Sequence, residues 1–244
     1  MKTVNRFFVA AGLIAGIASV VAAAVWSSSD NFGGTVLNGY ELNNGVWGSG
    51  VGPQTIWANS GTNWGVWTRQ PDAGGVKSYP RHERYVNRSL SSMRSMVGTF
   101  NVSTPSTSVG RWSVCYDLWD TNYRDETMVW MNYTGNADGG GNIKPISFNY
   151  DATGRAVPVA TNVLIAGHRW NIFRGNFGTN CTTFIRTTRT NSGTVDLLAL
   201  LRYAQSRGYI GNQTVGSQEF GFEISSTYDT GQNFGVNNST INWN

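Results

Sequence analysis

The sequence predicts an all-β domain, a β-sandwich or jelly roll, that carries a single helix. The first observation behind this prediction is composition: 13% of the 244 residues are aromatic, 30 are glycine and only 13% are charged, against a usual charged fraction of about 25%. The second is the regular alternation of short aromatic-rich segments with Gly, Asn and Ser turns. The third is that only one segment, residues 195–208, shows helical spacing of apolar residues.

The composition also narrows the function. A surface rich in Asn, Thr, Ser and Gly and poor in charge is typical of secreted β-sheet proteins that bind neutral polar ligands such as sugars. The sequence pI of about 9.2 could indicate a nucleic-acid-binding protein, but the basic residues are scattered and no cluster of five or more Lys or Arg occurs. The chain therefore lacks the basic patch that binding to nucleic acid requires.

The N-terminus resembles a secretory signal peptide. Lys2 and Arg6 precede an apolar run, Phe7–Val21, and three alanines follow it as small residues for cleavage. The run is short and two glycines interrupt it, which favours a cleaved signal peptide over a permanent membrane anchor. We expect residues 1–24 to be removed and 25–244 to form one secreted, extracellular domain that is monomeric and free of the membrane.

The first strands are short. Aromatic-rich segments separated by turn residues are predicted to be strands between residues 26 and 70, with examples at Tyr40–Gly48, Gln54–Trp57 and Trp64–Trp67. Pro80 should close a strand or lie at a sheet edge. The most basic stretch, residues 81–95, is interpreted as a solvated loop and an edge strand.

A β-hairpin is predicted in the middle of the chain. The runs Ser113–Trp119 and Arg124–Met131 favour β-structure, and the turn Asp120–Tyr123 separates them. Alternation places on one face an apolar set, Val114, Tyr116, Leu118, Val129 and Met131. The opposite face carries a mixture unsuited to a core: Cys115, Asp117, Trp119, Glu126, Met128 and Trp130.

That mixed face is the first candidate site. If the turn centres on Thr121 and Asn122, Asp117 falls directly opposite Glu126, with Cβ atoms roughly 4.5–5.5 Å apart. Two acids so close together among tryptophans are unfavourable unless the face has a function. We therefore interpret it as an active or binding site.

After the hairpin, residues 136–142 form a predicted loop, and Trp170–Gly175 and Thr182–Arg189 are predicted to be strands. The helix at 195–208 could be capped by Thr194 or Ser192 and ended by Gly208. Its apolar side should pack on the back of a sheet.

A second pair of acids lies near the C-terminus. In the strand-like segment Gln218–Ser225, alternation directs Phe220, Phe222 and Ile224 to the core and Glu219 and Glu223 to the opposite face. The two glutamates are roughly 13 Å apart at the usual strand rise. Only one of them can lie within catalytic distance of Glu126, and spacing alone does not choose.

Sparse acids on tryptophan-lined strand faces indicate glycoside hydrolysis. This chemistry uses two carboxyl groups, about 5–5.5 Å apart in a retaining enzyme, and aromatic faces suit sugar rings. His82 and His168, the only histidines, occur in unrelated contexts, so neither a serine–histidine triad nor a histidine-rich metal site is indicated. Cys115 and Cys181 have no neighbours at metal-ligand spacing, and the sequence does not decide whether they form a disulfide.

The motifs of this chain are similar to those of glycoside hydrolase family 12, the small secreted β-jelly-roll endoglucanases and xyloglucanases. In family order they are N-N-G-V-W-G at Asn43–Gly48, S-Y-P at Ser78–Pro80, Y-D-L-W at Tyr116–Trp119, D-E-T-M-V-W-M-N at Asp125–Asn132, R-G-Y-I at Arg207–Ile210 and G-F-E-I at Gly221–Ile224. The chain departs from the family pattern where Gly45 looks inserted in the first motif and where Ser225 stands in place of an aromatic residue.

The resemblance implies a two-sheet antiparallel β-jelly roll, a concanavalin-like sandwich, with a cleft on its concave face and the helix on its convex face. It also implies a role for each site residue. Glu126 would be the nucleophile, Glu223 the acid/base, and Asp117 would hydrogen-bond the nucleophile. The substrate-binding residues would be Asn44, Trp47, Met128 and Trp130. No metal or other cofactor is implied.

The sequence thus predicts a secreted retaining endo-β-1,4-glucanase acting on cellulose, mixed-linkage glucan or xyloglucan. Three alternatives remain open. A xylanase of the related jelly-roll family would use the same chemistry, a non-catalytic carbohydrate-binding protein would keep the cleft without turnover, and a structural export protein would neither bind nor cleave glucan.

Overall fold

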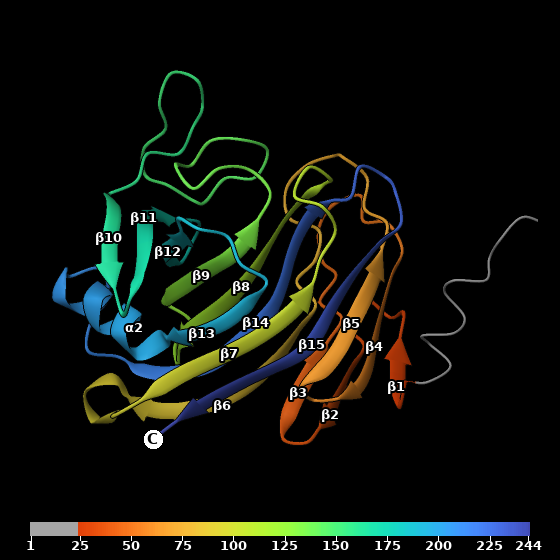
Figure 1. The fold of residues 1–244 in the computed structure, drawn as a ribbon, viewed down its shortest axis with the longest axis horizontal. Coiled ribbons are helices and arrows are strands. Elements are labelled where there is room, and N and C mark those ends of the chain that lie inside the picture. The colour runs from red at the N-terminus through yellow and green to blue at the C-terminus, as the bar shows by residue number, and fades with distance from the viewer. Residues whose placement is uncertain (1–23) are drawn as a thin grey trace, which may run out of the picture.

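The computed structural model describes residues 24–244, which form two packed β-sheets (Figure 1). Residues 1–23, which hold almost all of the predicted signal peptide, lie outside the described residues. The elements in chain order are β1 (Trp26–Ser28), β2 (Gly34–Leu37), β3 (Tyr40–Asn43), β4 (Gln54–Ser60), β5 (Asn63–Thr68), β6 (Arg81–Ser89), the 3-10 turn η1 (Leu90–Ser92), β7 (Met96–Ser103), β8 (Arg111–Asp120), β9 (Asp125–Tyr133), β10 (Ala160–Ile165), β11 (His168–Asn176), β12 (Asn180–Arg186), β13 (Ser192–Asp196), α2 (Leu197–Ser206), β14 (Thr214–Ser226) and β15 (Gln232–Trp243).

The larger sheet has nine strands in the order β10-β11-β12-β9-β8-β14-β6-β3-β2, and the smaller has six in the order β1-β4-β5-β15-β7-β13. Neighbouring strands are antiparallel except β12 and β9, which run parallel. A connection of 26 residues between β9 and β10 carries the chain away before β12 returns beside β9. The predicted jelly-roll sandwich is confirmed, with one parallel pair in the larger sheet.

The main core lies between the two sheets. Val114, Tyr116, Leu118, Val129 and Met131, the predicted apolar face of the hairpin, are all buried in it. A second cluster covers the opposite face of the nine-stranded sheet, and it includes Cys115, Met128, Trp130 and Cys181. Side-chain alternation along β8 and β9 therefore separates the core face from the face that carries the acids.

The helix is shorter than predicted and begins at a different cap. The side chain of Asp196 accepts a hydrogen bond from the Ala199 N–H at 2.9 Å. Thr194 and Ser192, the predicted caps, instead belong to β13, which pairs with β7. Gly208, at φ +68°, follows the C-terminal end as predicted. Five of the ten helical side chains enter the main core, so α2 packs on the face of the large sheet away from the acids.

The hairpin register differs from the prediction by two residues. Glu126 lies opposite Trp119, and Asp117 lies opposite Met128. The reason is a longer turn: the Asp120 carboxylate accepts backbone hydrogen bonds from Asn122, Arg124 and Asp125, at 3.1, 2.6 and 2.9 Å. A shift of two preserves the face of every side chain, so Asp117 and Glu126 remain diagonal neighbours on one face.

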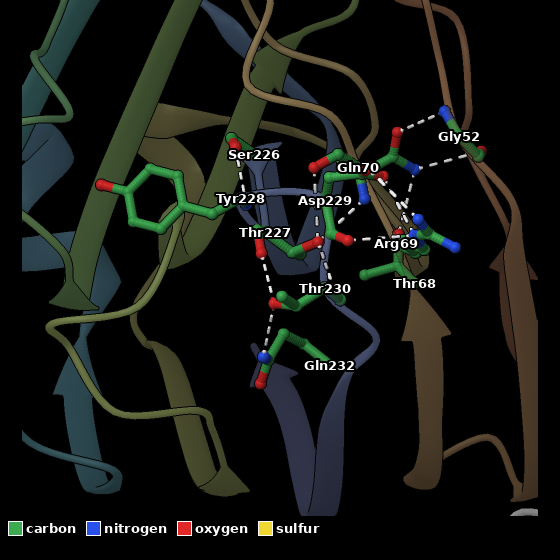
Figure 2. A network of polar contacts seen from close by, with 10 residues as sticks. All are labelled: Gly52, Thr68, Arg69, Gln70, Ser226, Thr227, Tyr228, Asp229, Thr230 and Gln232. Atoms are coloured by element: carbon green, nitrogen blue, oxygen red, sulfur yellow. Dashed lines mark hydrogen bonds and ion pairs between the residues drawn. The ribbon is translucent and has the colours of Figure 1, made fainter.

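A polar network ties the two sheets together at one end (Figure 2). The backbone N–H of Gln70, after β5, donates to the Thr227 hydroxyl at 2.8 Å, and the Thr227 N–H donates to the Gln70 carbonyl at 3.0 Å. Arg69 pairs with Asp229 at 3.0 Å in the same turn. Thr227 directly follows β14, so these contacts anchor the end of the strand that carries Glu223.

Among residues 24–244, no helix has both the length and the apolar character needed to cross a bilayer.

Candidate active site

Three adjacent strands of the large sheet bring four acids to one face. Asp117 is on β8, Glu126 on β9, and Glu219 and Glu223 are on β14. Asp117 is paired in register with Glu219 on one side and with Met128 on the other. The carboxyl groups are buried or nearly so, which makes their protonation sensitive to every neighbouring charge.

These acids line an open cleft. Its central part has a volume of about 290 Å³ and is lined by Trp47, Val76, Tyr79, Asp117, Glu126, Met128, Ile146, Phe177 and Glu223. One side continues into a space of about 400 Å³ that shares Glu126 and adds Phe32, Trp119 and Tyr123. The other continues into about 310 Å³ that shares Glu223 and adds Arg111, Asn142 and Lys144. The cleft is aromatic on the Glu126 side and polar on the Glu223 side.

Glu126 and Asp117 form one proton-sharing pair. Burial raises the pKa of both carboxyls, and the negative charges of Glu126 and Glu219 raise the pKa of Asp117 further. The Asp117 carboxyl and the Cys181 thiol beside Glu126 oppose the rise in the pKa of Glu126. Among the described residues no Lys or Arg is ion-paired with either acid. Because the pKa of Asp117 is raised well above its usual range, Asp117 is the member of the pair that favours its protonated form.

Glu223 lines the same cavity as Glu126. Burial, followed by the negative charge of Glu126, raises the pKa of Glu223 to about 8. Its Oε2 atom is buried and has no hydrogen-bond donor among the described side chains. A carboxyl group with this pKa is mostly protonated at pH 7.

Glu219 differs from Glu223 because it has a cation. The Arg81 Nε atom lies 2.9 Å from a Glu219 carboxylate oxygen, and Arg81 also reaches Glu83 at 3.5 Å. Burial raises the pKa of Glu219 to about 8, although Arg81 opposes that rise. The Arg81 guanidinium occupies a Glu219 oxygen, whereas no Lys or Arg among the described residues is ion-paired with Glu223, so the two glutamates differ in their partners.

The fold of this chain occurs in known proteins. The xyloglucanase domain of NopAA, a type three effector from Sinorhizobium fredii, solved in complex with cellobiose, is 42% identical over 91% of this chain and 100% of that chain, with a TM-score of 0.88. The chain belongs to glycoside hydrolase family 12. The native family 12 xyloglucanase from Bacillus licheniformis has the same fold, at 22% identity over 90% of this chain and 100% of that chain, with a TM-score of 0.72.

Endoglucanase S from Pectobacterium parmentieri is 27% identical to this family 12 hydrolase over 85% of this chain and 84% of its own length. No protein-family model matches the chain. The sequence resemblance is thus confirmed at the level of family, fold and glycoside hydrolase class.

The structure places two of the four predicted substrate-binding residues of this family 12 hydrolase at the cleft surface. Trp47 is 51% exposed and lines the central space with Met128. Trp130 is only 2% exposed, and its ring packs near that of Tyr133, 6.1 Å away. It lies beneath the cleft wall, where it supports the site without a surface for stacking on a sugar.

Asn44 does not reach the cleft. It is fully buried, its amide Nδ2 donates to the Asp30 carbonyl at 2.9 Å, and its Oδ1 accepts from Gln54 at 3.1 Å. Asn43 lines the aromatic side of the cleft instead. Gly45, in the left-handed region at φ +53°, follows directly and reverses the chain. Asn44 therefore lies beneath the cleft in this structure, and its neighbour Asn43 is the residue at the cleft surface.

Sequence reasoning missed several cleft residues of the hydrolase. Tyr79 lies in the central space, and its hydroxyl donates to the Cys115 carbonyl at 3.2 Å. Arg81 was assigned to a solvated edge, but β6 is an interior strand between β14 and β3. Phe177 and Tyr123 come from loops. Of these residues, only Tyr79 belongs to a motif that the sequence analysis identified, S-Y-P at Ser78–Pro80.

The cysteines of the hydrolase are both buried and unbonded. Cys181 lies beside Glu126 on the parallel strand β12, and Cys115 lies on β8. Within residues 24–244 no group of three or more His, Cys, Asp or Glu side chains is arranged to hold a metal ion.

Proposed function

We propose that this family 12 hydrolase is a retaining endo-β-1,4-glucanase that cleaves cellulose-like β-glucans: cellulose, mixed-linkage glucan or xyloglucan. The observation that carries the proposal is that Glu126 and Glu223, an acid with a pKa raised to about 8, share a cavity on the floor of an open cleft. An open cleft suits internal cleavage of a long chain. The names of the relatives, two xyloglucanases and an endoglucanase, support this substrate class.

In the first step a Glu126 oxygen attacks the anomeric carbon, and the bond from that carbon to the glycosidic oxygen breaks. The electron pair goes to the departing oxygen, which takes the proton of Glu223. The products are a glycosyl ester on Glu126 and a free chain end. Asp117, hydrogen-bonded to Glu126, keeps the nucleophile ionised and oriented.

In the second step the Glu223 carboxylate removes a proton from water. The resulting nucleophile attacks the anomeric carbon, and Glu126 leaves with its electron pair. Two inversions restore the original anomeric configuration. The reaction consumes only water, so the proposed mechanism requires no cofactor.

The aromatic side of the cleft suits the sugars that stay with Glu126. Phe32, Trp47, Trp119, Tyr123 and Phe177 all line it, and their rings match the apolar faces of pyranoses. Asn43 supplies an amide for hydroxyl groups. Glu223 borders the polar side, so the leaving chain departs there, past Arg111 and Lys144.

We also propose that the protein is exported. The support is the sequence pattern of residues 1–24, with its basic start, apolar run and alanines. N-terminal sequencing of protein recovered from the culture medium would test export, and a start near residue 25 is the expected result. A chain that stays cell-bound with residue 1 intact would contradict it.

The catalytic proposal is tested by reducing-end release from carboxymethylcellulose, xyloglucan and xylan. The intact domain should cleave glucan, while Glu126→Ala and Glu223→Ala should each lose roughly 10³-fold or more in kcat. Glu219→Ala is the matched control, an acid from the same strand face that should retain most activity. Greater activity on xylan would favour the xylanase alternative, and glucan binding without release would favour the non-catalytic one.

A further inference from the structure

Asp117 alone does not supply all the hydrogen-bond donors that the buried Glu126 carboxylate needs. The proposed nucleophile is buried, is required to be ionised, and forms no ion pair with a cation among the described residues. A buried carboxylate in that position needs hydrogen-bond donors to hold its charge. Asp117 supplies one proton, and a carboxylate has two oxygens that accept.

The neighbour on the other side of Glu126 is a cysteine. Strand β12 runs parallel to β9, and Cys181 lies in register with Glu126, as Thr183 does with Met128. Cys181 is 1% exposed and belongs to the cluster on the cleft side of the sheet, with Met128 and Cys115. The thiol therefore points to the same side of the sheet as the carboxylate beside it.

Thr183 determines where the thiol hydrogen goes. Its Oγ1 lies 3.6 Å from the Cys181 sulfur, and both side chains are buried. Since an ionised carboxylate is a much stronger acceptor than a hydroxyl, the S–H is directed to Glu126 and the threonine O–H to the sulfur. The result is a chain of donors, from Thr183 to Cys181 to Glu126.

We propose that Cys181 is a positioning residue for the nucleophile: its thiol donates to the Glu126 carboxylate from the side opposite Asp117. The inference rests on the proposed role of Glu126. The thiol remains protonated throughout, because burial and then the charge of Glu126 raise its pKa. It is a donor that neither reacts with substrate nor forms a disulfide.

The test is the pH dependence of inactivation by a 2-deoxy-2-fluoro-β-cellobioside with a dinitrophenolate leaving group. This probe reports on the nucleophile, since its leaving group needs no proton from Glu223. In Cys181→Ala the acidic limb should move to higher pH by about 0.4–1 unit, the loss of one neutral hydrogen bond. Cys181→Ser keeps a hydrogen-bond donor, so its acidic limb should lie at the same pH as that of the intact enzyme.

Cys115→Ala is the matched control, because it removes a second buried thiol of the same cluster that lies on β8 rather than beside Glu126. Its acidic limb should coincide with that of the intact enzyme. Unfolding temperatures of all three variants separate a lost hydrogen bond from misfolding.

The inference is overturned if Cys181→Ala, folded and active, keeps the original limb, or if Cys181→Ser shifts it as far as Cys181→Ala does. Failure of the proposed function has a different signature, because the intact enzyme would then neither cleave glucan nor react with the probe at Glu126.

Discussion

At the scale of single residues, the site depends on similar carboxyl groups having different neighbours. Glu126, Glu219 and Glu223 share one sheet face and are all largely removed from water. Glu126 lies beside the hydrogen-bond donors Asp117 and Cys181, and Glu219 lies against the Arg81 guanidinium. Glu223 is buried near the negative charge of Glu126. The environment of each acid, rather than its type, assigns its role.

The pKa of Glu223 predicts an alkaline limit to activity. Because Glu223 must be protonated to act, kcat/KM on soluble glucan should fall about tenfold per unit above a pH of about 8. On an aryl cellobioside whose leaving group needs no acid, this limb should be weak or absent in the intact enzyme. On soluble glucan Glu219→Ala should keep the limb, and a limb that disappears in Glu219→Ala would assign the acid to Glu219.

At the scale of elements, the β8–β9 turn sets the position of the nucleophile. The Asp120 carboxylate accepts three backbone hydrogen bonds within this turn, and Tyr123 occupies the left-handed region at φ +54°. A β-branched or bulky residue rarely adopts that conformation, and its presence beside a cleft marks a constrained segment. The turn therefore defines which residue of β8 faces Glu126.

Asp120→Ala should destabilise the protein by about 1–3 kcal/mol, because three N–H groups lose their acceptor. Urea-induced unfolding measures the change. The control is Asp125→Ala in the same turn, whose carboxylate contacts only the exposed Asn180 amide at 3.3 Å, and which should change stability by less than about 0.5 kcal/mol. Equal effects of the two substitutions would mean that the carboxylate does not support the turn.

At the scale of the whole molecule, the packed sheets stabilise a cleft floor whose buried acids oppose folding. The core between the sheets buries large aromatic side chains such as Trp64, Trp112 and Trp170. On the opposite face, the same nine-stranded sheet holds buried acids. Each acid whose pKa is raised by folding binds its proton more tightly in the native state, so stability depends on pH.

Stability should therefore fall between about pH 6.5 and pH 8. Glu223 and Glu219, whose pKa values are raised from 4.5 to about 8, contribute stability that is present at low pH and is lost as the pH rises from about 4.5 to 8. His82, with a pKa lowered from 6.5 to about 4 by burial, acts in the opposite direction only below 6.5. The slope from Glu223 is at most about 1.4 kcal/mol per pH unit.

Urea unfolding of the intact domain and of Glu223→Gln, at the two ends of this range, provides the measurement. The free energy of unfolding of the variant should depend less on pH. Relative to the intact domain, the variant should therefore become more stable as the pH approaches 8. The control is Glu41→Gln, at an exposed position of β3, which should leave the slope unaltered. Stability that rises with pH would contradict the prediction.

Much of this architecture was predictable because it depends on local patterns. The period of two along β8 and β9 assigned every hairpin side chain to the correct face, although the turn was two residues longer than expected. The helix was found by its spacing, but its cap was misplaced because β13 pairs with β7 directly before it. Strand pairing is non-local, so the sequence pattern did not reveal that β6 is interior.

By itself, the sequence determined the fold class, the family and the strand faces that carry the acids, because periodicity and short motifs are properties of adjacent residues. Only the tertiary structure paired Glu219 with Arg81, placed Asn43 rather than Asn44 at the cleft, showed the cysteines unbonded and set Cys181 beside Glu126. Each of these depends on groups distant in the chain, such as Arg81 for Glu219. The charge state of a buried acid is set by neighbours that only folding brings together.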